Sequence, residues 1–254
     1  MTQPLVGSLI ALLVIIARVG GLVVTAPVLA SPALPKIIRI AITLTLGLAV
    51  WSIIPAMTNI AQGGVGLLIL LGIEFALGAT IGFLMSIPLV ACQMAGTLMG
   101  QQMSLALPSM LDPASGSQTD ILGQGFMMLA VVSFVLVGGV EQMFSALVAS
   151  FSHLPAAALL EQGFAHSVGA MLNTAFVFAL RMALPILAVL MLQTAVLAIV
   201  ARSMPQLNIF SIGLPLRILV GLLVLVGGLA FIGQSMEMYL PLGMDAVTSW
   251  AGVN

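Results

Sequence analysis

Charged side chains are scarce in this sequence: only 5% of the 254 residues are Asp, Glu, Lys or Arg, against about 25% in an ordinary soluble domain. Hydrophobic residues make up 61% of the chain. A chain with so few charges cannot cover a water-facing surface, and its net charge of −1 excludes the basic face that nucleic-acid-binding proteins use. The composition therefore predicts an integral membrane protein.

Cysteine is almost absent as well. Cys92 is the one cysteine, so no disulfide can form within the chain, and no Cys or His spacing is typical of a metal site. The sequence also lacks the Gly-rich loop of ATP-binding proteins, the HExxH motif and the GxSxG motif. We therefore expect no cofactor, no metal and no enzymatic activity. An intramembrane enzyme would need its nucleophile and base at membrane depth, whereas both histidines fall in a connector.

What the sequence does have is six apolar runs, separated by polar or proline-containing connectors. About 20 residues suffice to cross the ~30 Å hydrocarbon core of a bilayer. The third run, which begins near residue 65, and the fifth run, at 171–201, are longer than that. Pro88 and Pro185 lie within these runs and predict kinks. We expect an all-α fold of about six long, partly kinked apolar helices.

Two local patterns predict how these helices pack and begin. Small residues recur one helical turn apart in four pairs of the third run, which lets helix backbones approach closely. These pairs are Gly72 with Ala76, Gly78 with Gly82, Ala91 with Ala95, and Gly96 with Gly100. Asp120 directly precedes the fourth run and is a good N-cap residue. We therefore expect close helix contacts along the third run and a capped start of the fourth helix.

The longest stretch that a bilayer would reject runs from Gln101 to Gln124. It contains two prolines and a Ser-Gly-Ser turn, which a spanning helix does not tolerate, yet it also has large apolar side chains. Non-helical backbone at membrane depth persists only where protein buries it or where it lines a watery cavity. We interpret the stretch as a re-entrant or pore-plugging loop, and an ordinary loop packed on helix ends is the alternative. The candidate plug residues are Met103, Leu105, Leu107, Met110 and Leu111, followed by a turn at Asp112 and Pro113.

Three charged residues lie deep within apolar runs, where an ionised side chain is costly unless it is paired or functional. These residues are Arg18, Glu74 and Arg181. We expect Glu74 and Arg181 to pair across the third and fifth helices, or with partner subunits, and we interpret Arg18 in the same way. A proton pathway is the alternative, although one acid and one base make a poor relay.

A connector bracketed by arginines follows the fifth run and reads RSMPQLNIFSIGLPLR, from Arg202 to Arg217. Its amide side chains can satisfy backbone groups while its prolines stiffen the turn. A hairpin connector and a docking site for partner subunits both remain open. The candidate connector or docking residues are Pro205, Gln206, Asn208 and Phe210.

This connector resembles the PQLN-x-F-x-x-G-x-P-L-[KR] segment of the FliR family of flagellar export-gate proteins and of their virulence type III secretion counterparts. The stretch from Gly96 to Gln124 is similar to the family's small-residue helix, which is followed by a Gln-Met pair, an Asp-Pro and a glycine-containing turn. The segment from Ala33 to Arg39 also fits. The resemblance covers essentially the whole chain.

The resemblance implies a subunit of the flagellar type III export gate, which helps to form and plug the channel for unfolded flagellar proteins during flagellum assembly. The implied partners are FliP and FliQ in a hetero-oligomeric gate, FlhB and FlhA, the exported proteins and membrane lipid. The implied location is the bacterial inner membrane, at the base of the flagellar basal body. The alternative function is small-solute secondary transport, which would need a midplane site between repeat-related broken helices.

The resemblance also implies helical hairpins as the architecture. Residues 1–170 would form a FliP-like helical part that includes the plug loop at about 101–124. Residues 171–254 would form a FliQ-like helical hairpin that contains the PQLN connector.

Overall fold

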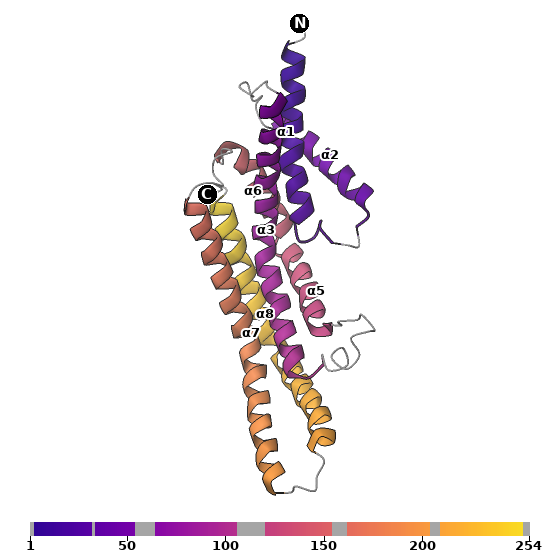
Figure 1. Cartoon of the computed structure of the whole chain (residues 1–254), viewed down its shortest axis with the longest axis vertical. Helices are drawn as coiled ribbons and strands as arrows, with labels where there is room; N and C mark the ends of the chain where they lie inside the picture. Colours follow the sequence, from indigo (N-terminus) through magenta and orange to yellow (C-terminus); the bar gives the residue numbers. More distant parts are fainter. Residues whose placement is uncertain are drawn as a thin grey trace. The chain divides into compact units, whose positions relative to one another are not determined.

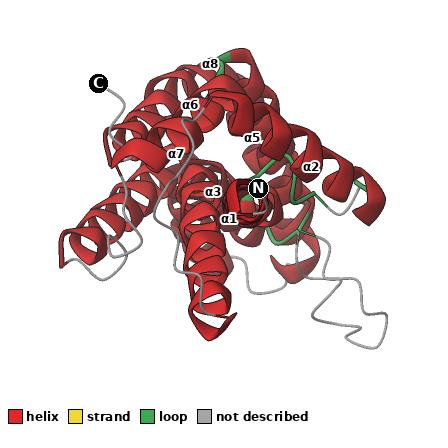
Figure 2. Cartoon of the chain, turned by 90° about the horizontal axis from the view of Figure 1, so that it is seen from above, coloured by secondary structure: helices red, strands yellow, loops and turns green. Residues whose placement is uncertain are grey.

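The computed structural model describes residues 3–31, 34–53, 64–105, 120–153, 162–203 and 209–250. Helices make up nearly all of this described part, and it contains no strand (Figures 1 and 2). The predicted all-α class is therefore confirmed. The helices are α1 Gln3–Thr25, α2 Lys36–Ile53, α3 Gly64–Gln102, α5 Ile121–Leu136, α6 Gly139–His153, α7 Gln162–Ser203 and α8 Ile209–Trp250.

Five of these helices, α1, α2, α3, α7 and α8, are long and apolar enough to cross a membrane. Helices α5 and α6 form a sixth candidate, because together they pass the same test although the chain bends by 67° between them. Gly138 lies at this bend with a φ of +80°, a conformation that glycine adopts without strain. The six apolar runs of the sequence thus correspond to six candidate spans.

Two helices are longer than the sequence predicted. Helix α7 begins at Gln162, before the expected start at residue 171. Helix α8 extends from Ile209 to Trp250 and includes the second half of the expected connector. Apolar residues four, four and three positions apart continue the buried face of α8 almost to its end, which explains the length of the helix. These residues are Met236, Leu240, Met244 and Val247.

The overlong runs are continuous helices in the structure. Helix α3 has 39 residues and continues through Pro88, and α7 has 42 residues and continues through Pro185. At a rise of ~1.5 Å per residue, a helix of 42 residues is about 63 Å long, roughly twice the hydrocarbon thickness. A bilayer therefore cannot cover such a helix along its whole length.

The chain divides into two compact units. The first comprises residues 1–87, 134–172 and 241–254, and the second comprises residues 88–133 and 173–240. In the first unit, α1 packs against α2 and against the first part of α3. A Cβ added to Gly78 of α3 would clash with the backbone of Arg18 and Leu22, so the two helix backbones lie in direct contact. The close approach predicted from the small-residue spacing is confirmed at Gly78, whereas at Gly72 it is wrong, because a Cβ added there would meet nothing within 4 Å.

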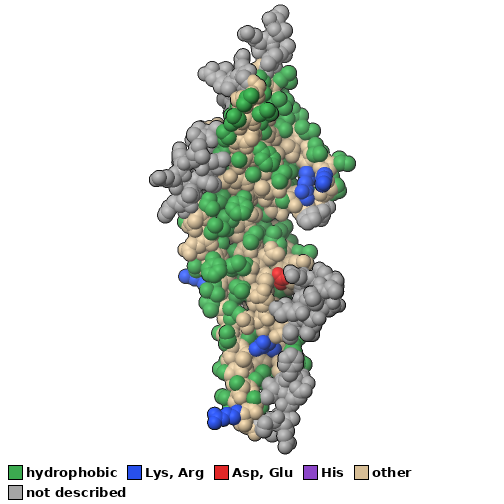
Figure 3. All heavy atoms as spheres, viewed as in Figure 1, with side chains coloured by type: hydrophobic (Ala, Val, Ile, Leu, Met, Phe, Trp, Pro, Cys, Tyr) green, Lys and Arg blue, Asp and Glu red, His purple; other side chains and the backbone are tan. Residues whose placement is uncertain are grey.

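In the second unit, the end of α3 packs against α5, and α7 lies beside α8. Large apolar side chains remain exposed along α7 and α8, and green apolar side chains are visible over much of the face in Figure 3. Only 22% of the apolar window of α7 and 11% of that of α8 are buried within the chain. The outer surface of these two helices is therefore available to lipid or to other proteins.

Candidate functional site

Helix α3 ends in a turn that defines where the predicted plug stretch begins. The N–H of Ser104 donates to the carbonyl of Gln101 at 3.0 Å, and the N–H of Leu105 donates to the carbonyl of Gly100 at 3.0 Å. These two bonds make a Schellman motif. Ser104 has a φ of +62°, the left-handed conformation that the motif requires and that glycine usually supplies. The chain therefore leaves α3 in a defined direction.

Met103 anchors this turn on α8. Its side chain is fully buried within the chain. A Cβ added to Gly221 of α8 would lie only 2.8 Å from Cε of Met103 and 2.9 Å from its Sδ. The methionine side chain thus occupies the space that the glycine leaves open, and a larger residue at position 221 would displace it.

Arg217 of α8 links the same turn to α7. Its Nη1 donates to Oγ of Ser104 at 3.3 Å, and its Nη2 donates to Oγ1 of Thr194 in α7 at 2.8 Å. Arg217 and Gly221 are four residues apart and therefore lie on one face of α8. The guanidinium also brings a positive charge to the C-terminal end of α3, where the helix dipole favours it.

Asp120 holds the other end of the predicted plug stretch. Its Oδ1 accepts a hydrogen bond of 2.9 Å from the N–H of Gly123, so the predicted N-cap of α5 is confirmed. Its Oδ2 accepts a short hydrogen bond from Oγ1 of Thr97 in α3. A Cβ added to Gly96 would lie 2.7 Å from the carbonyl oxygen of Leu122, which confirms close packing at this predicted glycine. The start of α5 is thereby fastened to α3.

The two ends of the stretch are thus both attached to α3, at Met103 to Leu105 and at Asp120. Of the predicted plug residues, Met103 is buried and Leu105 is half-buried. The others lie outside the described residues, so their role stays a prediction: Leu107, Met110, Leu111, Asp112 and Pro113.

The PQLN connector is described only in part. Pro205, Gln206 and Asn208 lie outside the described residues. Phe210 belongs to the first turn of α8, but its side chain is also outside the described part. Its docking role stays a prediction.

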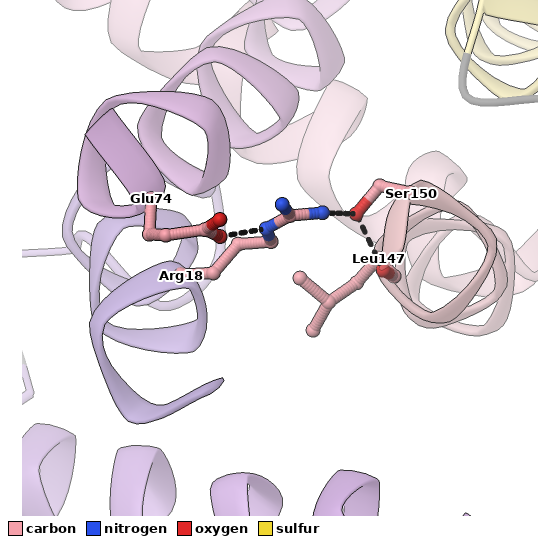
Figure 4. A network of polar contacts seen from close by, with 4 residues as sticks. All are labelled: Arg18, Glu74, Leu147 and Ser150. Atoms are coloured by element: carbon pink, nitrogen blue, oxygen red, sulfur yellow. Dashed lines mark hydrogen bonds and ion pairs between the residues drawn. The ribbon is translucent and has the colours of Figure 1, made fainter. Parts of the chain in front are cut away.

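A buried ion pair lies in the first unit (Figure 4). Nε of Arg18 donates to Oε2 of Glu74 at 2.6 Å, and Nη1 of Arg18 donates to Oγ of Ser150 at 3.0 Å. The guanidinium also stacks over Phe151, with 4.2 Å between its central carbon and the ring centroid. Arg18 and Glu74 are only 2% and 5% exposed. The ion pair neutralises both charges and joins α1 to α3, and the hydrogen bond to Ser150 joins α1 to α6.

The expected pairing of Glu74 with Arg181 is therefore wrong. Arg181 is exposed rather than buried, and its Nη1 donates to the hydroxyl of Tyr239 in α8 at 2.8 Å. Tyr239 in turn packs on Phe178, with ring centroids 4.4 Å apart. Depth within an apolar run shows that a charge needs a partner, but it does not show which residue faces that charge.

Several residues of these networks were missed at the level of sequence. The sequence marks Arg217 only as the end of a connector, although Gly221, one turn later, leaves space on the same helical face. Ser150 carries no recognisable signal, because single serines are common in membrane helices.

The described residues contain no group of three His, Cys, Asp or Glu side chains that could hold a metal ion.

Comparison with known proteins supports one family across the chain. Residues 9–241 match the family described as bacterial export proteins, family 1. The flagellar biosynthetic protein FliR of Bacillus subtilis strain 168 is 28% identical over 85% of this chain and 85% of its own length. FliR of Pectobacterium carotovorum is 31% identical over 82% of this chain and 80% of its own length.

A relative from another type of system is also similar. The Yop proteins translocation protein T of Yersinia pestis is 29% identical over 79% of this chain and 78% of its own length. The match to the family spans nearly all of the helices, from α1 to α8. The chain belongs to the bacterial export proteins, family 1.

Proposed function

We propose that this chain is a subunit of the flagellar type III protein export gate, where it helps to form and plug the channel for unfolded flagellar proteins. The observation that carries this proposal is the anchoring of residues 103–105 and Asp120 on one helix, in a member of a family of export proteins. The family and its flagellar relatives favour protein export over small-solute transport. The chain itself acts as a channel component and not as an enzyme.

The plug is an apolar constriction in this proposal. Hydrophobic constrictions close a pore because water leaves them, and methionine adapts to varied shapes because it is unbranched and flexible. Met103 is buried on Gly221, so it anchors the plug rather than facing the channel. The residues that exclude water are Leu105, Leu107, Met110 and Leu111, next to the turn at Asp112 and Pro113.

The proposed partner subunits cover the parts of α7 and α8 that extend beyond the lipid. Helices α7 and α8 have 42 residues each and are mostly exposed within the chain, so protein neighbours are needed along part of their length. FliP and FliQ fill this role in the proposed gate, with FlhB and FlhA associated, in the inner membrane at the base of the flagellar basal body. Arg181, which is exposed on α7, pairs with a polar group of one of these subunits.

The proposed division of the chain into two parts is the one that the family resemblance implies. Residues 1–170 form a FliP-like part and residues 171–254 form a FliQ-like hairpin. The connector between α7 and α8 docks onto partner subunits through Pro205, Gln206, Asn208 and Phe210.

Native mass spectrometry of a tagged chain, extracted gently from its host membrane, tests the assembly. We expect this chain together with several copies of smaller FliP-like and FliQ-like proteins. A stable monomer or homodimer in several detergents, without such partners, would contradict the export-gate proposal.

Deleting residues 108–118 tests the plug, because both anchors at Leu105 and Asp120 remain. We expect the assembled gate to form and the membrane to leak ions. A matched variant replaces residues 108–118 with a Gly-Ser segment of equal length. If the plug seals the pore through its apolar side chains and not merely by filling space, this variant should leak as well. Unchanged ion permeability of a correctly assembled deletion would rule out the plug.

A further inference from the structure

Three features of the second unit meet at the point where the chain leaves α3. The C-terminal turn of α3 contains the left-handed Ser104, α8 contributes Arg217 and Gly221, and α7 contributes Thr194. We propose that Arg217 is a positioning residue that holds the closed plug in place by fastening the beginning of the plug stretch, where the chain leaves α3, to α7 and α8. This inference rests on the proposed plug function.

The geometry separates Arg217 from an ordinary surface arginine. One guanidinium bridges two hydroxyl groups from different helices, Ser104 and Thr194, through different nitrogens. Thr194 is itself oriented, because its Oγ1 donates to the carbonyl of Leu190 at 2.8 Å. A planar guanidinium has its donors in a fixed arrangement, so it can make both bonds at once, which a lysine ammonium on a flexible stem does less well.

The conformation of Ser104 explains why a fastening is needed. A left-handed conformation disfavours residues with a Cβ by roughly 1 kcal/mol, so a serine at this place weakens the turn relative to glycine. The serine hydroxyl, however, supplies the acceptor for Arg217, which a glycine lacks. Met103 packed over Gly221 fixes the preceding residue on the same face of α8. The direction of the chain at Leu105 therefore depends on contacts from α8 as well as on α3 itself.

The test compares ion leak through the assembled export gate in cells that carry Arg217→Gln, Arg217→Lys or the control Arg202→Gln. Arg202 is exposed in the last turn of α7, so its loss removes an arginine charge without touching the turn. We expect Arg217→Gln to raise the leak about tenfold, the effect of losing hydrogen bonds from a charged group. Arg217→Lys should show a smaller rise, and Arg202→Gln none.

Two further measurements separate positioning from folding. Ser104→Gly keeps the turn, and relieves its strain, but removes the hydroxyl, so it should leak while the complex assembles normally. Hydrogen exchange at the N–H of Leu105 should be faster in Arg217→Gln than in the unaltered complex, while exchange at Gly123, beside the other anchor, should not change.

The deletion of residues 108–118 is measured in parallel. If the deletion leaks and both Arg217→Gln and Ser104→Gly remain tight, the positioning role of Arg217 is overturned while the plug stands. If the deletion does not raise the ion leak of an assembled gate, both the plug function and the positioning role of Arg217 are overturned. If Arg217→Gln does not assemble, the leak and the Leu105 exchange of Ser104→Gly decide the question.

Discussion

Arg18 and Glu74 are 56 residues apart in the sequence, yet Nε of the arginine lies 2.6 Å from Oε2 of the glutamate in a buried contact. Ser150 supplies a further hydrogen-bond acceptor for the guanidinium, and Phe151 supplies a ring face. Each charge is thus compensated inside the chain. A buried network in which the two charges compensate each other favours a structural role over the proton pathway.

Breaking this pair should destabilise the protein strongly. Glu74→Gln leaves the arginine charge buried without a counter-charge, and removing one member of a buried ion pair costs about 3–5 kcal/mol. The double variant Arg18→Met with Glu74→Leu should recover most of the loss, because neither charge remains. The thermal transition of the purified complex in detergent measures both. Equal destabilisation by the single and the double variant would contradict the pairing argument.

Two glycines of α3 should respond in opposite directions to alanine. Gly78→Ala should destabilise the protein, because the new methyl would clash with the backbone of α1, and overpacking typically costs about 1–3 kcal/mol. Gly72→Ala meets nothing within 4 Å and should stabilise the helix by up to ~1 kcal/mol. The transition temperatures of the two variants give the comparison. A stabilising Gly78→Ala would show that α1 and α3 are not in backbone contact.

A large residue at position 221 should displace Met103. Gly221→Leu places side-chain atoms where Cε and Sδ of the methionine lie. Gly228→Leu, two turns further along α8, is the control, because a Cβ added there meets nothing within 4 Å. We expect only Gly221→Leu to raise the ion leak of the assembled gate. The second variant Gly221→Leu with Met103→Ala should restore part of the seal, because it removes the displaced side chain.

Loss of the Asp120 cap should loosen the start of α5. Asp120→Ala removes the acceptor for the N–H of Gly123 and for the hydroxyl of Thr97, and loss of an N-cap costs about 1 kcal/mol. Asp120→Asn should retain most of the cap, since asparagine is an equally good capping residue. Hydrogen exchange at the N–H of Gly123 measures the difference. Similar exchange in Ala and Asn variants would argue against the capping role.

Several properties of this protein follow from the sequence alone, and each has a local cause. Hydropathy and run length predict the membrane helices, because a helix that crosses lipid needs only its own residues to satisfy its backbone. Asp120 predicts the start of α5, since its carboxylate accepts a hydrogen bond from an N–H only three residues later in the sequence. The glycine spacing at Gly96 predicts a close helix contact, although it does not say with which helix. The PQLN connector and the stretch at 101–124 indicate the export-protein family.

The tertiary structure alone decided which residues meet. Glu74 pairs with Arg18 and not with Arg181, because the packing of α1 against α3 brings these two side chains together. Arg217 bonds to Ser104, 113 residues away in the sequence, because α8 passes the end of α3. Helical periodicity fixes which side chains share a face of one helix, but the pairing of faces between helices depends on the packing of the whole unit. That is why the anchors of the predicted plug became visible only in three dimensions.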